Sequence, residues 1–388
     1  MRVLHINSGN LYGGIETLLA TLARLRSVCP EMEPEFALCF EGRLSEELRE
    51  TGAAVYPLCP ARVSRPWTVW QARRALRRLL TERSYDVVIC HGSWNHALFG
   101  PVVRRRGIPL VYWAHGPFTP GHWLDRWANW TRPDLVLANT RWTRENMEFF
   151  RSAPAEVLHY PVAAASSLDR EADRRAIRAE TQTPDDAVVI VHASRLAAWK
   201  GHKLLLDALR RLADQPGWEC WIAGGPQRPE EDSYLEHLRA KAATAGIAGR
   251  VRFLGQRHDV PRVLAAADIH CQPNLSPEPF GIAFVEAMYA GLPVVTIAHG
   301  GVLEIVDDTC ALLAPPGDEA VLSELLEQLI RQPDLRQRLG SAGPGRASEL
   351  CDPGHTIARL ARRLVRLKGA NRADWSTGDS APICVPVP

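Results

Sequence analysis

Short runs of apolar residues alternate with amphipathic stretches along most of the chain. The first run, RVLHI at residues 2–6, precedes IETLLATLARLRS, a segment whose apolar residues recur at helical spacing. Strands that are apolar on both faces and joined by helices are typical of a parallel sheet covered on both sides. The alternation therefore predicts an α/β protein.

The alternation occurs twice. One series runs to about residue 161 and includes FALCF, YDVVICHG, IPLVYWAHG, DLVLANT and AEVLHYPV, with a helix expected over RWTRENMEFFRS between the last two. After a polar, Ala-rich stretch a second series begins, with VVIVHAS, WECWIAGG, VRFLG, DIHCQPN and PVVTI. The 388 residues also exceed the usual size of one hydrophobic core. We therefore expect two doubly wound, Rossmann-like domains that face one another across a ligand-binding cleft.

The pattern also predicts where the parts begin and end. We place the first domain at residues 1–163 and the second at 164–353. A last amphipathic helix is expected at 354–369, where it would pack back on the first domain. Residues 370–388 show no periodicity and are expected to be disordered.

Charge is distributed unevenly between the two parts. The net charge of +2 gives no argument for a nucleic-acid partner, and we expect none. Residues 1–163, however, hold 20 Arg, no Lys and 15 acidic residues, together with eight of the twelve Trp. A basic, Trp-rich domain favours an anionic acceptor or an anionic membrane surface.

The cysteines and the apolar runs indicate in which cellular compartment the protein is found. Nine cysteines are scattered without any C-x-x-C pair, as expected of reduced core thiols in a cytosolic protein. The N-terminus opens directly on a strand pattern without a signal peptide, and no apolar run is long enough to span a bilayer. We expect a cytoplasmic protein, with peripheral binding to the inner face of the plasma membrane as a further hypothesis.

Two carboxylates lie in the stretch SPEPFGIAFVEAMYAGLPVV (residues 276–295). Gly281 permits close approach of a ligand, and a helix is expected from Ile282 to about residue 290. The N–H groups of residues 280–283 would then form an anion site at a helix start. Glu286 could bind a vicinal diol such as a ribose, and Glu278 could approach a sugar beside the phosphates. Taken alone, either acid also fits a solvated surface position.

Basic residues and glycines follow two other predicted strands. Arg195 and Lys200 lie five residues apart in SRLAAWKG, where two cations beside a helix start suit a diphosphate. Gly13 and Gly14 in SGNLYGGIE allow close backbone approach, although the loop lacks both a P-loop lysine and a complete G-x-G-x-x-G. Surface basic residues and an ordinary turn remain the alternatives.

Two histidines, His91 and His115, end apolar strands, where sites form in such sheets. A single histidine there is usually structural, and the pair leaves both interpretations open. No His/Cys/Asp/Glu cluster has metal-ligand spacing, so we expect no bound metal.

Together these motifs resemble the retaining GT-B glycosyltransferases, the large group that includes bacterial glycogen synthases and lipopolysaccharide sugar transferases. The resemblance extends from residue 3 to about 368 and rests on the order of six motifs: GGIE at 13–16, WAHG at 113–116, RLAAWKG at 195–201, IAGGP at 222–226, VRFLG at 251–255 and E-x7-E at 278–286. It implies an acceptor-side first domain, a donor-side second domain and hexosyl transfer from a UDP-, GDP- or ADP-sugar, without a cofactor or metal, to a glycan or lipid-linked acceptor.

The resemblance also implies roles for the candidate residues. Arg195 and Lys200 would hold the donor diphosphate and stabilise it as it leaves, because no metal does so. Glu286 would bind the ribose and His115 the donor sugar. The donor sugar and distal phosphate would be held by Glu278 and by the backbone of Phe280, Gly281, Ile282 and Ala283. Gly13 and Gly14 would bring the first domain against the phosphates.

The chain departs from the family pattern at three places. Ser194 stands where the family usually has Gly, Pro279 replaces the first Gly of E-G-F-G, and HYPV at 159–162 replaces P-N-G. A GT-B sugar-nucleotide 2-epimerase and a non-catalytic nucleotide-sugar binder therefore remain as alternative functions.

A basic helix is a candidate for membrane docking. The stretch ARVSRPWTVWQARRALRRLL (residues 61–80) has no acid and predicts a helix from about residue 67, with its leucines inward. The exposed face would carry Trp67, Trp70, Arg73, Arg74, Arg77 and Arg78, preceded by Arg62 and Arg65. Residues 104–106 add a second basic run. A solvated basic face and a docking surface for anionic lipid both fit this pattern.

Overall fold

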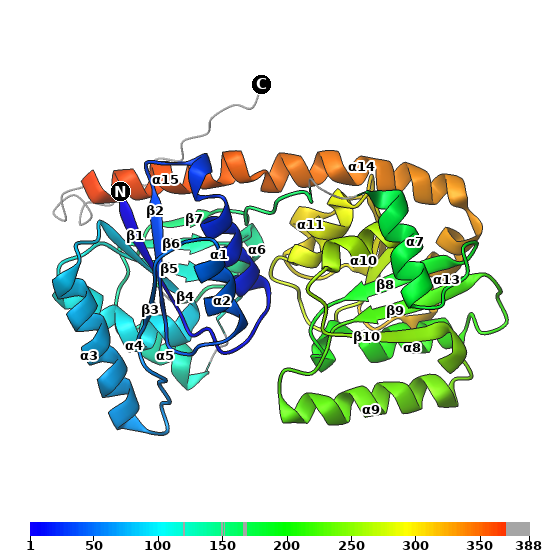
Figure 1. Ribbon diagram of the computed structural model, residues 1–388, viewed down its shortest axis with the longest axis horizontal. Helices are drawn as coiled ribbons and strands as arrows, with labels where there is room; N and C mark the ends of the chain where they lie inside the picture. The colour runs from blue at the N-terminus through cyan, green and yellow to red at the C-terminus, as the bar shows by residue number, and fades with distance from the viewer. Residues whose placement is uncertain (119–120, 149, 151, 166–168, 370–388) are drawn as a thin grey trace.

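The computed structural model describes residues 1–118, 121–148, 150, 152–165 and 169–369. Figure 1 shows two α/β halves side by side, with α14 (Pro333–Cys351) and α15 (Pro353–Gly369) running along one side of both. The predicted fold class, two parallel-sheet units with helices, is confirmed. The proposed division at residues 163/164 and 353/354 stays a prediction.

The N-terminal half is built on a seven-stranded parallel sheet with the order β3-β2-β1-β4-β5-β6-β7. Its strands are β1 (Arg2–Asn7), β2 (Glu33–Leu38), β3 (Val55–Pro57), β4 (Val87–His91), β5 (Leu110–Ala114), β6 (Leu135–Ala138) and β7 (Ala155–Val157). The connecting helices are α1 (Gly14–Arg24), α2 (Arg43–Glu50), α3 (Pro66–Glu82), α4 (Gly92–Arg105), α5 (Trp123–Ala128) and α6 (Arg141–Glu145).

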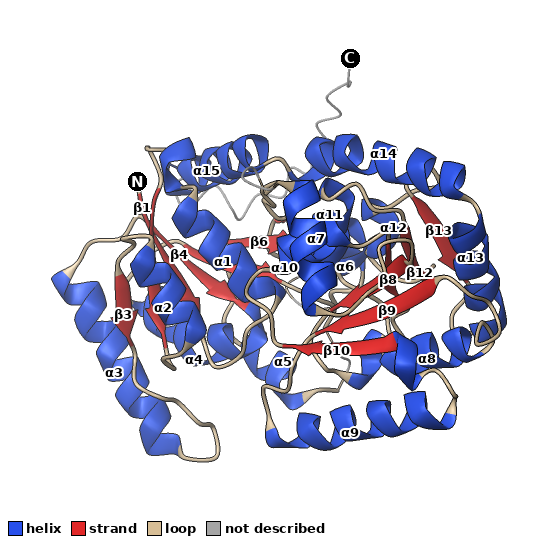
Figure 2. Ribbon diagram, turned by 45° about the vertical axis from the view of Figure 1, so that its right-hand side comes forward, coloured by secondary structure: helices blue, strands red, loops and turns tan. Residues whose placement is uncertain are grey.

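The C-terminal half has a six-stranded parallel sheet with the order β10-β9-β8-β11-β12-β13 (Figure 2). Its strands are β8 (Val188–Ala193), β9 (Trp218–Ala223), β10 (Val251–Gly255), β11 (Ile269–Gln272), β12 (Val294–Ile297) and β13 (Ala311–Ala314). Its helices are α7 (Arg170–Glu180), α8 (His202–Arg210), α9 (Pro229–Thr244), α10 (Val260–Ala266), α11 (Ile282–Tyr289), α12 (Val302–Ile305) and α13 (Glu319–Arg331).

Both sheets reverse their strand order at one point, between β1 and β4 and between β8 and β11. At such a point the loops after neighbouring strands turn to opposite faces and leave a crevice at the carboxyl ends of the strands. The loops that follow β1, β8 and β11 carry Gly13, Arg195 and Glu278. The topology therefore directs the predicted site residues toward the two crevices.

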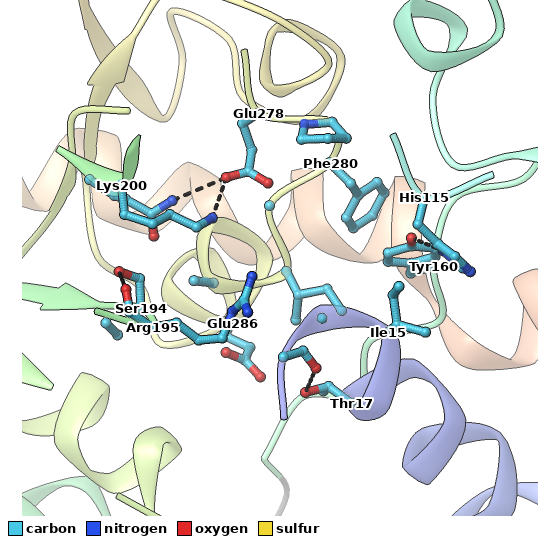
Figure 3. Close-up of a pocket in the computed structure, with 18 of the residues that line it drawn as sticks. Ile15, Thr17, His115, Tyr160, Ser194, Arg195, Lys200, Glu278, Phe280 and Glu286 are labelled. Atoms are coloured by element: carbon cyan, nitrogen blue, oxygen red, sulfur yellow. Dashed lines mark hydrogen bonds and ion pairs between the residues drawn. The ribbon is translucent and has the colours of Figure 1, made fainter. Parts of the chain in front are cut away.

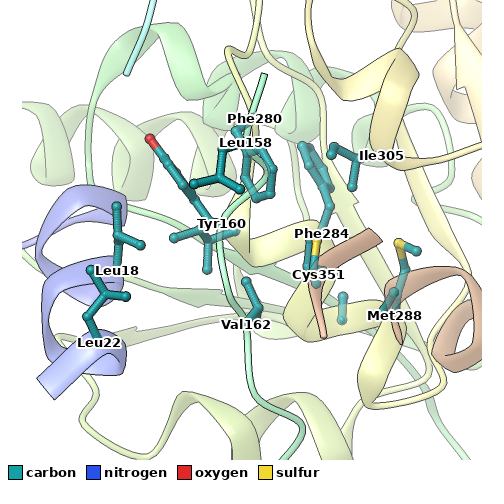
Figure 4. Close-up of a cluster of buried hydrophobic side chains, with 14 of the residues drawn as sticks. Leu18, Leu22, Leu158, Tyr160, Val162, Phe280, Phe284, Met288, Ile305 and Cys351 are labelled. Atoms are coloured by element: carbon teal, nitrogen blue, oxygen red, sulfur yellow. The ribbon is translucent and has the colours of Figure 1, made fainter. Parts of the chain in front are cut away.

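One apolar cluster connects the halves (Figure 4). Leu18 and Leu22 of α1 belong to the same cluster as Phe284 and Met288 of α11, with Tyr160 from the segment after β7. The C-terminal helix α15 joins the cluster through five buried residues, Ile357, Leu360, Ala361, Leu364 and Leu367. The cleft between the halves therefore has a packed apolar floor.

Polar contacts attach α15 to the N-terminal half. Lys368 Nζ lies 2.7 Å from Asp86 Oδ1, and Arg363 Nε lies 2.5 Å from Glu156 Oε2. At the crossing between the halves, the backbone N–H of Val162 donates to the Cys351 carbonyl at 2.9 Å. The last helix, α15, thus contacts the N-terminal half although it follows the C-terminal half in sequence.

Three further expectations can be compared with the structure. The helix predicted over RWTRENMEFFRS ends at Glu145, because Phe150 adopts φ 60° and its ring packs 5.1 Å from that of Tyr112. The tail at 370–388, expected to be disordered, lies outside the described residues. Within the described ranges, no helix combines the length and apolar character needed to cross a bilayer.

Candidate active site

A cavity of about 310 Å³ lies in the cleft between the halves (Figure 3). Its lining includes every residue that the sequence analysis assigned to catalysis or donor binding: Gly13, Gly14, His115, Arg195, Lys200, Glu278, Phe280, Gly281, Ile282, Ala283 and Glu286. Residues from four segments that are distant in sequence, which follow β1, β5, β8 and β11, therefore meet around one space.

A second cavity of about 570 Å³ adjoins the first and shares part of its wall: Gly13, Thr17, Ala193, Ser194, Arg195 and Glu286. Its remaining wall includes Gly224 and Gly225 after β9 and Arg257 and His258 after β10. Volumes of 300 to 1,000 Å³ are usual for small-molecule sites. The two cavities together can hold an elongated ligand that carries a charged group at its centre, where the cavities join.

Two glycines bring the backbone close to the cavity wall. Gly281 adopts φ 88°, and a Cβ there would lie 2.3 Å from the Phe284 ring. Gly201 adopts φ 81°, and a Cβ there would lie 1.7 Å from the Pro273 carbonyl oxygen. These positions start α11 and α8, so only glycine allows both helices to begin at the cavity.

Glu278 and Lys200 form a buried ion pair across the loop ends. Lys200 Nζ lies 2.5 Å from Glu278 Oε2, and the side-chain amides of Asn274 and Gln272 donate to the same oxygen at 3.0 and 3.3 Å. Burial lowers the pKa of Lys200, whereas the Glu278 carboxylate raises it. The ammonium also lies 4.1 Å above the Trp199 ring. The Glu278 carboxylate and the Trp199 ring thus hold the Lys200 cation at the cavity.

Glu286 and Arg195 lie where the two cavities join, and Figure 3 shows them close together. Burial raises the pKa of Glu286 to about 7. The Arg195 side chain makes no ion pair within the described part of the chain, and its Nε lies 3.3 Å from where a Cβ on Gly13 would stand. Arg195 therefore reaches from the C-terminal half to the Gly13 loop with its charge available to a ligand.

His115 reaches the cavity, but both of its ring nitrogens already have partners. Nε2 lies 3.0 Å from His91 Nδ1, and Nδ1 is hydrogen-bonded to the Tyr160 hydroxyl. Burial lowers the pKa of His115 to about 3, so its ring is neutral. The Tyr160 hydroxyl and Asn139 also line the cavity.

Several lining residues were not found from the sequence. Tyr160 lies in HYPV, whose departure from P-N-G was a usable signal, whereas Asn139 follows β6 and Gln272 ends β11 as isolated polar residues. Their roles depend on contacts with His115 and Glu278 that no local pattern indicates. The described ranges contain no group of three or more His, Cys, Asp or Glu residues placed to hold a metal ion.

The eight cysteines in the described ranges are free thiols. Seven of them are buried and one, Cys59, is exposed. The expectation of unpaired core thiols therefore holds for the seven buried cysteines, whereas Cys59 lies at the surface.

Two models of known glycosyltransferase families match this chain. Residues 173–346 match the family model described as Glycosyl transferases group 1, and residues 12–165 match Glycosyltransferase Family 4. The chain belongs to the group 1 glycosyltransferases. The resemblance drawn from the six motifs is thereby confirmed.

Individual relatives are also glycosyltransferases by name. The chain is 29% identical over 325 residues to the alpha-D-kanosaminyltransferase of Streptomyces kanamyceticus, covering 76% of this chain and 81% of that enzyme. It is 28% identical over 363 residues to the lipopolysaccharide core biosynthesis glycosyltransferase LpsD of Rhizobium meliloti, covering 88% and 92%. These similarities place the chain among the sugar transferases.

Solved structures show the same fold. The crystal structure of Anabaena HepE in complex with UDP and glucose matches with a TM-score of 0.82 at 23% identity, covering 94% of this chain and 99% of that one. The two-sheet architecture is therefore the GT-B fold.

Proposed function

We propose that this glycosyltransferase moves a hexose from a nucleotide-diphosphate sugar to a hydroxyl acceptor with retention of anomeric configuration and without a metal ion. The observation that carries the proposal is the meeting of Arg195, Lys200 and the start of α11 with Glu278 and Glu286 around one cavity. HepE, which shares the fold, was crystallised with UDP-glucose, and this supports a nucleotide sugar as the ligand.

The charges suggest how the donor would lie. The diphosphate would contact Arg195, Lys200 and the first N–H groups of α11, where cations and helix N–H groups favour an anion. The ribose diol would then reach Glu286 and the base would enter the second cavity. The sugar would lie toward Glu278 and Tyr160. Because Lys200 is paired with Glu278 in the ligand-free site, a bound phosphate would share its cation.

The same geometry supports a metal-free transfer step. The bond between the anomeric carbon and the diphosphate oxygen would break as a bond to the acceptor oxygen forms on the same face. The departing phosphate would take the acceptor's proton, and Arg195 and Lys200 would offset its negative charge. Glu278 and the neutral His115–Tyr160 pair would surround the sugar during this exchange.

A membrane-linked acceptor is the second part of the proposal. Trp67 and Trp70 of α3 are 59% and 53% exposed, and the Arg74 guanidinium lies 5.5 Å above the Trp70 ring. Arg73 differs from expectation, because it donates to the Leu98 carbonyl at 2.6 Å and anchors α3 to α4. The remaining exposed Trp and Arg side chains suit an anionic lipid surface on the cytoplasmic side, as required for a bacterial surface glycan or glycolipid.

Product analysis separates the proposal from its rivals. The purified protein would be incubated with UDP-, GDP- and ADP-sugars and an acceptor panel, and the products separated by mass and anomeric configuration. Transfer with retained configuration is the expected result. A C2 epimer of the donor would support the epimerase alternative, and binding without any turnover would support the non-catalytic binder.

A thermal-shift panel of nucleotide sugars would identify the donor before the transfer assay. A ligand at 100 times its dissociation constant stabilises the folded state by about 2.7 kcal/mol. The nucleotide sugar with the largest shift in melting temperature is then the donor for the transfer assay.

A further inference from the structure

Three histidines and a tyrosine form a buried hydrogen-bonded row that ends at the cavity. His5 Nδ1 of β1 lies 3.0 Å from His91 Nε2 at the end of β4, and His91 Nδ1 lies 3.0 Å from His115 Nε2. His115 Nδ1 then bonds the Tyr160 hydroxyl (Figure 3). The row crosses three neighbouring strands and continues to the segment after β7. Only its last member, Tyr160, has a terminal polar group facing a space large enough for a ligand.

The two ends of the row differ. At one end, His5 Nε2 is buried and has no hydrogen-bond partner. At the other end, the Tyr160 oxygen also accepts from Asn139 Nδ2 at 3.2 Å. The Asn139 amide cannot be turned over, because the same Nδ2 faces the His115 carbonyl oxygen at 3.4 Å, and that oxygen can only accept. Asn139 is therefore a donor to Tyr160.

Each imidazole in the row is neutral and carries one N–H. Burial lowers the pKa of His5 and His115 to about 3 and that of His91 well below its usual value. A row of neutral rings has two possible proton directions. In the first, Tyr160 donates to His115 and each ring donates from Nε2, which leaves the Nε2–H of His5 as a buried donor without a partner.

In the second direction each ring donates from Nδ1. His5 donates to His91, His91 to His115, and His115 to the Tyr160 oxygen. The unpartnered atom of His5 is then an acceptor, and the donor without a protein partner is at Tyr160, which lines the cavity, where water or a ligand can accept from it. In the first direction that donor is enclosed at His5, and buried unpaired donors are rarer than buried unpaired acceptors. The Tyr160 oxygen now accepts two bonds, from His115 and Asn139, so its own O–H has no protein partner in the described residues and is left for the cavity.

We propose that Tyr160 is a specificity-determining hydrogen-bond donor to a hydroxyl of the donor sugar, and that His5, His91 and His115 are positioning residues that fix its proton toward the cavity. The inference rests on the proposed function for the identity of the ligand. It assigns the sugar contact at this wall to Tyr160, since both nitrogens of His115 are occupied by His91 and Tyr160.

The arrangement predicts which donors the enzyme rejects. The Tyr160 ring is fixed 4.5 Å from the Phe280 ring, and the residue is 3% exposed, so its O–H cannot turn to bulk water. A site built to bond a hydroxyl discriminates strongly against an analogue that lacks it, because the buried donor is left unpaired. One monodeoxy form of the donor sugar should therefore be a poor substrate.

The tautomers can be measured without any substrate. In full-length protein labelled with ¹⁵N-histidine, long-range ¹H–¹⁵N spectra distinguish an Nδ1–H ring from an Nε2–H ring, and single substitutions assign the signals. We expect the Nδ1–H form at His5, His91 and His115. The Nε2–H form at His91 or His115 would overturn the proposed proton direction. His96, whose Nε2 lies 2.7 Å from the Thr131 carbonyl outside the row, is the control and should show Nε2–H.

The sugar contact is tested with Tyr160→Phe and a set of monodeoxy donors. With the natural donor, kcat/KM should fall roughly 10- to 100-fold. With the deoxy donor that lacks the contacted hydroxyl, the kcat/KM of the wild type should already be reduced by that factor, and Tyr160→Phe should not reduce it further. Tyr112→Phe, which removes another buried hydroxyl that bonds Ser93 at 3.1 Å, is the matched control and should discriminate among donors as the wild type does.

Other outcomes would overturn specific parts. An equal loss with every donor would show that Tyr160 is only structural. If the wild type neither binds nor turns over any nucleotide sugar, the proposed function and the sugar contact both fail. The tautomer measurement needs no substrate and still tests the proton direction along the histidine row.

The positioning role is tested at His5, which touches no ligand. His5→Leu removes the first donor of the row and should reduce the discrimination between natural and deoxy donors. His5→Asn places an amide N–H near the position of Nδ1 and should recover that discrimination. Identical donor selectivity in His5→Leu and the wild type would overturn the role of the histidine row.

Discussion

Lys200 and Arg195 are both cations at the cavity, but they have different partners. Lys200 is paired with the buried Glu278, whereas Arg195 makes no ion pair in the described ranges. Lys200→Met should therefore destabilise the fold by about 1–3 kcal/mol, because Glu278 loses its cation while keeping its amide donors. Arg195→Ala should stay within about 0.5 kcal/mol of the wild type. Both substitutions should lower kcat strongly, because each removes a charge from the leaving diphosphate.

Urea unfolding and steady-state kinetics measure the two effects separately. The double variant Lys200→Met/Glu278→Gln is the control, since it removes both charges and should regain stability without regaining activity. Equal stability losses for Lys200→Met and Arg195→Ala would contradict the assignment of the pair.

Glu286 predicts a pH dependence of donor binding. Burial raises its pKa to about 7, so the carboxylate form that can accept two hydrogen bonds from a ribose exists mainly above that pH. Donor affinity should fall as the pH is lowered from about 8 to about 6, because the group then takes up a proton. Calorimetric titration measures the affinity, and Glu286→Gln should bind weakly at every pH. A pH-independent affinity in the wild type would argue against the ribose contact.

At the scale of elements, the sequence predicted strands and helices well where the signal was local. Apolar runs gave the central strands, and the glycines and prolines around residues 281–293 gave the bounds of α11 within one residue. The short α6 was predicted too long, since the φ of 60° at Phe150 follows from packing against distant aromatic rings. Contacts between distant segments, such as Tyr160 with His115, could not be predicted because nothing within either segment specifies the other.

The helix α3 carries the membrane prediction. Its leucines face inward as expected, and Arg78 pairs with Glu82 at 2.7 Å, so the free exposed charges are fewer than the sequence indicated. Arg62, Arg65 and Arg74 remain, and each basic residue near an anionic surface contributes about 1 kcal/mol. The protein should sediment with vesicles that contain anionic lipid at low salt, and less at high salt.

Matched variants make this test specific to α3. Trp67→Ala/Arg74→Gln should lose vesicle binding, whereas Arg239→Gln on α9, in the other half, should not. Equal partitioning of the wild type to neutral and anionic vesicles, or none to either, would remove the membrane hypothesis and leave a soluble acceptor.

At the scale of the whole molecule, the proposed transfer without a metal ion requires both halves to supply the site. The C-terminal half provides the cations and carboxylates, and the N-terminal half provides Gly13, His115 and Tyr160. Activity should persist in excess chelator, because in the proposed mechanism Arg195 and Lys200 take the place of a divalent ion at the diphosphate. Loss of turnover in chelator that magnesium or manganese restores would contradict this.

One of the polar contacts between the halves is a pair of hydrogen bonds beside the second cavity. Gln227, which follows β9, accepts from the Tyr12 N–H at 2.8 Å and donates to the Tyr12 carbonyl at 2.9 Å. Tyr12 is itself held by Arg43, whose guanidinium lies 3.7 Å above its ring. Each hydrogen bond contributes about 1 kcal/mol, so Gln227→Ala should favour a more open molecule.

An open molecule binds its donor less tightly, because the apparent dissociation constant rises as the competent fraction falls. Gln227→Ala should therefore show a larger radius of gyration by small-angle scattering and a roughly fivefold to tenfold weaker donor affinity, with unfolding stability nearly unchanged. Gln215→Ala is the control, since Gln215 bonds Arg331 within the C-terminal half. If Gln227→Ala matches the wild type in both radius and affinity, the two hydrogen bonds do not govern closure. The halves are then held together by the apolar cluster and by other bonds, such as those from the N–H groups of Arg141 and Trp142 to Glu304.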